Sequence, residues 1–177
     1  GFNVEDIVDS VIRETRYGYE EVSYLLLFGD LPNAKQLEDY TRLLGLRREL
    51  PPLFTRNMIM TSPSRSIMNQ IARNILALYA YDNKADDTSL ENVLRQSILL
   101  ISCFPTIAAY SYQAKCSHFY NQSLHLHYPL PELSTAENIL RLIRPMGEYS
   151  ELEAHLLDIS MILHAEHGGG NNSTFTT

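Results

Sequence analysis

The chain has 177 residues, of which 45% are hydrophobic and 20% charged, fractions that are ordinary for a globular protein with one buried core. Its net charge of −7 argues against a nucleic-acid or anionic-membrane surface, because both need clustered lysines and arginines. The longest apolar runs, 24–28 and 98–101, are far shorter than the roughly 20 residues of a membrane span. Cys103 and Cys116 are too few for a disulfide framework, so we expect a reducing, cytoplasmic setting.

Three helices are predicted before residue 51. Apolar residues at three-to-four spacing place the first over 4–12, and the second covers 19–28, where Gly29 is a typical stop residue. Asn33 is the expected N-cap of the third helix, which Pro51 ends.

Two further helices are predicted in the middle of the chain. The first runs from about 64 to 81, with Ser62 or Ser64 as its cap. The second is the longest periodic stretch, 88–115, and we expect Pro105 to kink or split it, because proline has no N–H group to donate.

The last third of the chain begins with an expected irregular connection over about 117–133, where prolines, aromatic residues and three histidines interrupt the periodicity. Residues 134–137 then form a capping box that opens a helix through Ile143, and Ser150 caps a final helix. We expect the final helix to bury Leu152, Leu156, Ile159 and Leu163. Because no segment shows the alternation of a strand, we predict an all-α, multi-helical fold in which 1–177 form a single partial domain.

The segment from His164 onward is the most informative for function. His164 and His167 are three residues apart and share a face if the helix continues through both. The glycines at 168–170 allow the backbone to approach a ligand closely, and Asn171 is a residue type that starts helices. A helix beginning there would aim free N–H groups at an anion, so a dicarboxylate fits this environment.

Other interpretations of this segment remain open on the residues alone. Two histidines at this spacing can bind a metal, but no third ligand is evident. A phosphate loop is weaker, because no strand precedes the glycines and no lysine follows them. A helix C-terminus with two hydrogen-bonded histidines competes evenly with a ligand site. His125 and His127 could also share a metal, but solvated loop residues are the better interpretation, so we predict no metal site.

The segment His164-Ala-Glu-His-Gly-Gly-Gly-Asn171 resembles the signature of citrate synthases and 2-methylcitrate synthases. Three earlier segments resemble the same family, in the same order: Phe2-Asn-Val-Glu-Asp-Ile7, Tyr19-Glu-Glu-Val-Ser-Tyr-Leu-Leu-Leu-Phe-Gly-Asp-Leu-Pro32 and Cys103-Phe-Pro-Thr-Ile-Ala-Ala-Tyr110. One departure is Ser62-Pro-Ser-Arg-Ser-Ile-Met-Asn69, where family members often carry a His-Pro-Met-Asp type of segment.

The resemblance implies that the chain is the front part of a citrate synthase-like large domain. The parent enzyme would be an acyltransferase that condenses oxaloacetate with acetyl-CoA to citrate and CoA. Acetyl-CoA would be its co-substrate, and no cofactor is expected. His167 and Asn171 match family residues that contact oxaloacetate, and His164 matches the first histidine of the signature. The family's two catalytic histidines and its aspartate are expected beyond Thr177, so we expect no catalytic residue in this chain and no activity from it alone.

The resemblance also implies a homodimer, with the predicted helices around 88–115 and 150–164 as candidates for its interface. Two alternatives remain: a 2-methylcitrate synthase that uses propionyl-CoA, and a non-catalytic helical interaction module that kept the fold and lost the chemistry.

Overall fold

The computed structural model describes residues 1–165, which are helical with no strand anywhere in that range, so the predicted all-α class is confirmed. The described chain divides into two compact units. Unit 1 comprises 1–41, 134–137 and 149 onward, whereas unit 2 comprises 42–133 and 138–148. A single partial domain over 1–177 stays a prediction.

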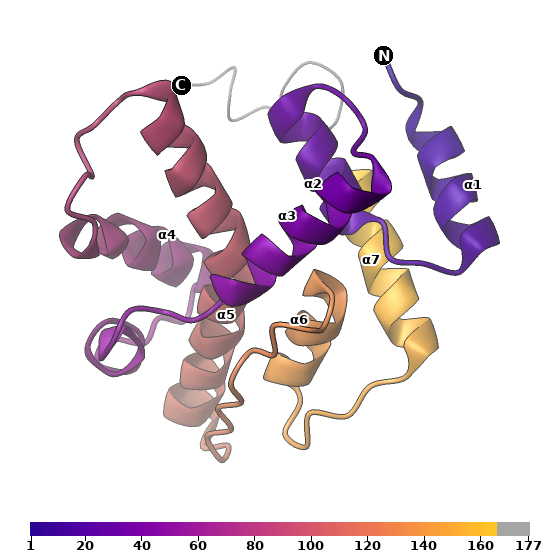
Figure 1. Ribbon diagram of the computed structural model, residues 1–177. Helices are drawn as coiled ribbons and strands as arrows, with labels where there is room; N and C mark the ends of the chain where they lie inside the picture. Colours follow the sequence, from indigo (N-terminus) through magenta and orange to yellow (C-terminus); the bar gives the residue numbers. More distant parts are fainter. Residues whose placement is uncertain (166–177) are drawn as a thin grey trace. The chain divides into compact units, whose positions relative to one another are not determined.

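Unit 1 contains α1 (Val4–Glu14), α2 (Tyr19–Phe28), most of α3 (Ala34–Leu46), the first turn of α6 (Thr135–Ile143), and α7 (Glu151–Ala165) (Figure 1). The predicted end of α2 is confirmed, because Gly29 follows the helix with a positive φ of 85°, whereas α3 ends at Leu46 rather than at Pro51. Asn33 and Gln36 exchange side-chain to backbone hydrogen bonds of 3.0 and 2.9 Å at the start of α3.

The core of unit 1 forms where α1 and α2 pack against α7. Val11, Val22 and Ile162 are its buried side chains. Gly18, at the start of α2, lies in close contact with this core: a Cβ at residue 18 would lie 2.4 Å from Val11 Cγ2 and 3.0 Å from Ile162 Cδ1. Glycine is therefore required where α2 begins, because any side chain would displace core atoms.

Unit 2 contains the end of α3, a π-helical turn η1 (Thr55–Met60), α4 (Ile67–Leu78), a 3₁₀ turn η2 (Tyr79–Tyr81), α5 (Leu90–Tyr120) and most of α6. Its core forms where α4 and η1 pack against α5. The largest buried members of this core include Phe54, Ile59, Ile71, Ile107 and Leu142.

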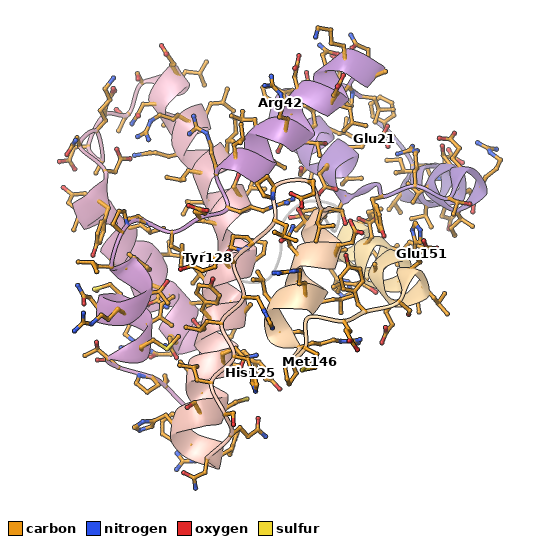
Figure 2. The ribbon with its side chains drawn as sticks, turned by 60° about the horizontal axis from the view of Figure 1, so that its bottom comes forward. Glu21, Arg42, His125, Tyr128, Met146 and Glu151 are labelled. Atoms are coloured by element: carbon orange, nitrogen blue, oxygen red, sulfur yellow. The ribbon has the colours of Figure 1, made fainter. Side chains whose placement is uncertain are left out.

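An irregular connection follows α5, and its second half is hydrogen-bonded to the rest of unit 2. It lies beside α5, with His125 and Tyr128 labelled on it in Figure 2. The Tyr110 hydroxyl of α5 donates to the His127 carbonyl at 2.7 Å. The buried Arg48 guanidinium donates to the Leu130 carbonyl at 2.9 Å, and Asn138 bonds both the N–H and the carbonyl of the same residue. These bonds satisfy backbone groups that a connection without secondary structure would leave unpaired.

The structure corrects the predictions for the middle of the chain. Ser66, rather than Ser62 or Ser64, caps α4, with its Oγ accepting from Asn69 N at 3.3 Å. Pro105 does not split the long helix: α5 is continuous from residue 90 to 120, so the irregular connection begins at 121 rather than 117. Buried side chains on both sides of Pro105, including Cys103 and Ile107, hold the two halves in one helix despite the missing N–H.

The buried face of α7 also differs from the prediction. Leu152, Leu156 and Leu163 are 68%, 57% and 52% exposed, whereas the buried residues of the helix are Ala154, Asp158 and Ile162. Apolar residues occur on both sides of this helix, so hydrophobicity alone did not identify the side that packs.

Helix α5 is the one helix within residues 1–165 that is long and apolar enough to cross a membrane by those criteria alone. Core helices of globular proteins meet the same criteria. Ile98, Cys103 and Ile107 of α5 are buried in unit 2, which accounts for the apolar composition of this helix.

Candidate functional site at the end of α7

The candidate site residues lie at the carboxyl end of α7 and in the segment after it. His164 lies on the last turn of α7 and is exposed. His167 and Asn171 lie outside the described residues. The structure therefore locates one of the three predicted substrate-binding residues.

The ring of His164 is oriented by its own helix. Nδ1 lies 2.7 Å from the carbonyl oxygen of Ser160, one turn earlier. Because a carbonyl only accepts, Nδ1 carries the proton and donates it, which leaves Nε2 as the nitrogen that can contact a ligand. A neutral ring then offers a lone pair at Nε2, and a protonated ring offers a second N–H donor.

Asp158 anchors α7 from within unit 1. This residue is fully buried, and its Oδ2 accepts from Gly18 N at 2.7 Å, whereas its Oδ1 accepts from Tyr19 N at 3.2 Å. Both N–H groups belong to the start of α2, where a helix has no acceptors of its own. The carboxylate of α7 thus caps α2.

A second buried carboxylate, Glu20, lies near Asp158. Glu20 Oε1 accepts from Thr135 N at 2.8 Å. A carboxylate of α2 thus caps the start of α6, in the same way that Asp158 of α7 caps the start of α2. Burial, as the main cause, and the Glu20 carboxylate raise the pKa of Asp158, and the hydrogen bonds from Gly18 and Tyr19 and the nearby His155 lower it, so that the resulting pKa is about 6. Sequence analysis missed both carboxylates, although Asp158 was a detectable signal because Leu157 and Ile159 flank it.

No group of three or more histidine, cysteine or acidic side chains that could hold a metal occurs among residues 1–165. Of the two histidines considered for a metal, His127 has another role. Its Nε2 lies 3.1 Å from the Arg144 carbonyl and 3.0 Å from the Pro145 carbonyl, just after α6. The His127 ring therefore bonds the connection to the end of α6 within unit 2.

Comparison with known proteins assigns the chain to a family. The family model described as the C-terminal domain of citrate synthase matches residues 1–177. The chain belongs to the citrate synthase family. A 2-methylcitrate synthase of Shewanella oneidensis is 27% identical over 99% of this chain, and the peroxisomal citrate synthase 1 of Arabidopsis thaliana is 30% identical over 94% of it.

A solved structure agrees with the family assignment. The citrate synthase of Pyrobaculum aerophilum matches 95% of the chain with a TM-score of 0.78 and 28% sequence identity. The chain spans 43% of the Shewanella protein, 35% of the Arabidopsis protein and 41% of the Pyrobaculum chain. This citrate synthase family member therefore corresponds to less than half the length of these relatives.

Proposed function

We propose that this chain forms part of the oxaloacetate site of a citrate synthase-type acyltransferase, which condenses oxaloacetate with acetyl-CoA to citrate and CoA. The observation that carries the proposal is the family match over residues 1–177 together with the segment at 164–171, which resembles the family signature. The exposed position of His164 at the end of α7 supports it, because a substrate-binding side chain has to be accessible.

In this proposal, the three residues bind the substrate through different groups. Asn171 supplies an amide donor, and His167 supplies an imidazole that polarises the substrate. His164 presents Nε2 to the substrate, because its Nδ1–H already donates to the Ser160 carbonyl.

The test is a titration of the purified chain with oxaloacetate, followed by NMR or calorimetry. We expect His167→Ala and Asn171→Ala each to weaken binding about tenfold or more, because each removes a polar contact to a charged ligand. His118→Ala in unit 2 is the matched control, since this exposed histidine has no role in the proposal. Equal affinities for the wild-type chain and both site variants would refute the assignment.

We also propose that the 177-residue chain forms no citrate alone. Abstraction of a methyl proton from acetyl-CoA needs a positioned base and groups that stabilise the enolate, and the family residues for both are expected beyond Thr177. Thiol release from acetyl-CoA in the presence of oxaloacetate, measured with a thiol reagent, is expected to equal the buffer control. Release above that control would contradict this proposal.

The acyl group is assigned as acetyl, with propionyl as the alternative. Relatives named citrate synthase and 2-methylcitrate synthase match the chain at similar identity, 30% and 27%. The rates at which a longer form of the protein forms citrate from acetyl-CoA and 2-methylcitrate from propionyl-CoA would decide between the two acyl groups. A longer form that forms neither product would favour the non-catalytic interaction module.

The remaining parts of the proposal are a homodimer in the cytoplasm that binds neither nucleic acid nor membrane. The exposed leucines of α7 support association, because large exposed apolar patches are typical of interaction surfaces. Cys103 and Cys116 are free and buried, which agrees with a reducing compartment.

A further inference from the structure

Helix α2 depends on another helix for its N-terminal cap. Gly18 occupies the N-cap position of α2 and has no side chain that could accept a hydrogen bond from the first N–H groups of the helix. The Gly18 and Tyr19 N–H groups are instead accepted by the two oxygens of Asp158, 140 and 139 residues away in the sequence. The usual local cap, a serine or aspartate at position 18, is blocked because a Cβ there would lie 2.4 Å from Val11 Cγ2.

This arrangement determines where α7 lies within unit 1. Two hydrogen bonds that end on one carboxylate define both the height of α7 along its axis and its rotation about that axis. Ile162, one turn further along, is 2% exposed in the core with Val11 and Val22, so packing and hydrogen bonding act on the same face. His164 follows Asp158 by six residues, about 9 Å along the helix axis. A shift at Asp158 is transmitted to His164 because the helix between them is continuous.

We propose that Asp158 is a positioning residue for the oxaloacetate site: its carboxylate holds α7 on the start of α2 and thereby sets where His164 meets the substrate. The inference rests on the proposed function. Asp158 itself, fully buried, does not contact the substrate.

The charges around Asp158 explain why a carboxylate differs from an amide there. From α2 it faces Tyr19 and the carboxylate of Glu20, and from α7 it faces His155, whose ring stacks on Tyr17 at 4.6 Å. Ionised Asp158 accepts from both N–H groups. An asparagine of the same size accepts through one oxygen, and its NH₂ group would face the second N–H.

The experiment compares the wild-type chain with Asp158→Asn by amide hydrogen exchange and by oxaloacetate titration. We expect Gly18 and Tyr19 to exchange at least about tenfold faster in the variant, and the Kd for oxaloacetate to rise about fivefold to twentyfold. The shift that oxaloacetate produces in the His164 ring signals is expected to decrease. Titrations are run at temperatures where circular dichroism shows both proteins fully folded.

Two control variants separate positioning from general destabilisation. Val22→Ala removes two buried methyl groups from the same core and leaves the hydrogen bonds of Asp158 in place. It is therefore expected to lower the Tm and leave the Kd for oxaloacetate unchanged. Asp9→Asn makes the same chemical change on the exposed side of α1 and is expected to behave as wild type.

Each outcome decides a specific point. If Asp158→Asn leaves the Kd and the Gly18 and Tyr19 exchange rates unchanged, or if Val22→Ala raises the Kd as much as Asp158→Asn does, the positioning role is overturned. If the wild-type chain does not bind oxaloacetate, the proposed function fails and this role fails with it. If the wild-type chain binds oxaloacetate and Asp158→Asn binds it with the same affinity, the positioning role alone is rejected.

Discussion

At the scale of single residues, Asp158 shows how burial and hydrogen bonding compete. The loss of water around the carboxylate disfavours its ionised form, and the hydrogen bonds from Gly18 and Tyr19 only partly compensate, so the pKa of Asp158 rises to about 6 from an ordinary value near 3.8. The folded protein therefore binds this proton more tightly than the unfolded chain does. The resulting stabilisation is complete below pH 3.8 and is lost as the pH rises through about 6.

We therefore predict that Asp158→Asn changes how stability depends on pH. Between pH 5 and pH 7.5, the wild-type free energy of unfolding should fall by about 1 kcal/mol more than that of the variant, because only the wild type loses a proton at this position. Urea unfolding at the two pH values measures the difference. Asp9→Asn should keep the wild-type dependence, and identical pH dependence in wild type and Asp158→Asn would contradict the assignment of the titration to Asp158.

At the scale of helices, local capping explains most of the boundaries. Ser134 and Glu137 exchange bonds of 2.7 and 3.2 Å at the start of α6, as the capping box predicted. Ser150 Oγ accepts from Glu153 N at 3.3 Å, and Glu153 bonds back to Ser150 N at 2.8 Å, which confirms the predicted cap of α7. Such bonds involve neighbours in the sequence, so residue types at short spacing are sufficient to predict them.

Removal of the α7 cap should have a measurable effect. Ser150→Ala is expected to lower the free energy of unfolding by about 1 kcal/mol, because the Glu153 N–H loses its acceptor. Ser160→Ala on the same helix is the control: its hydroxyl bonds to the Leu156 carbonyl within the helix, and alanine has the higher helix propensity. Equal destabilisation by both variants in thermal unfolding would argue against the cap.

At the scale of the whole molecule, the exposed leucines of α7 indicate a surface for association. These side chains repeat on the side of α7 opposite its buried residues, and Glu151 at the start of the helix points into solvent (Figure 2). Burial of such a face is favourable at roughly 25 cal/mol per Å² of apolar area. A second copy of this chain would provide a matching face.

We expect the protein to self-associate at high concentration and Leu156→Glu to weaken that association, because a charge would have to be buried in the contact. Light scattering over a concentration series measures the mass. Leu46→Glu makes the same change at an exposed leucine of α3 and should leave the association intact. A monomeric wild type, or equal association of the two variants, would count against an interface on α7.

The sequence by itself determined the helical class, the caps at Asn33, residues 134–137 and Ser150, and the resemblance to the citrate synthase family, because periodicity, capping and motifs depend on residues close together in the chain. Only the tertiary structure decided which side of α7 is buried and that Pro105 lies within one continuous helix. Only the tertiary structure showed that Asp158 caps α2, since the carboxylate and its partner Gly18 are 140 residues apart in the sequence. Local interactions could be predicted, whereas burial depends on which distant segments pack together.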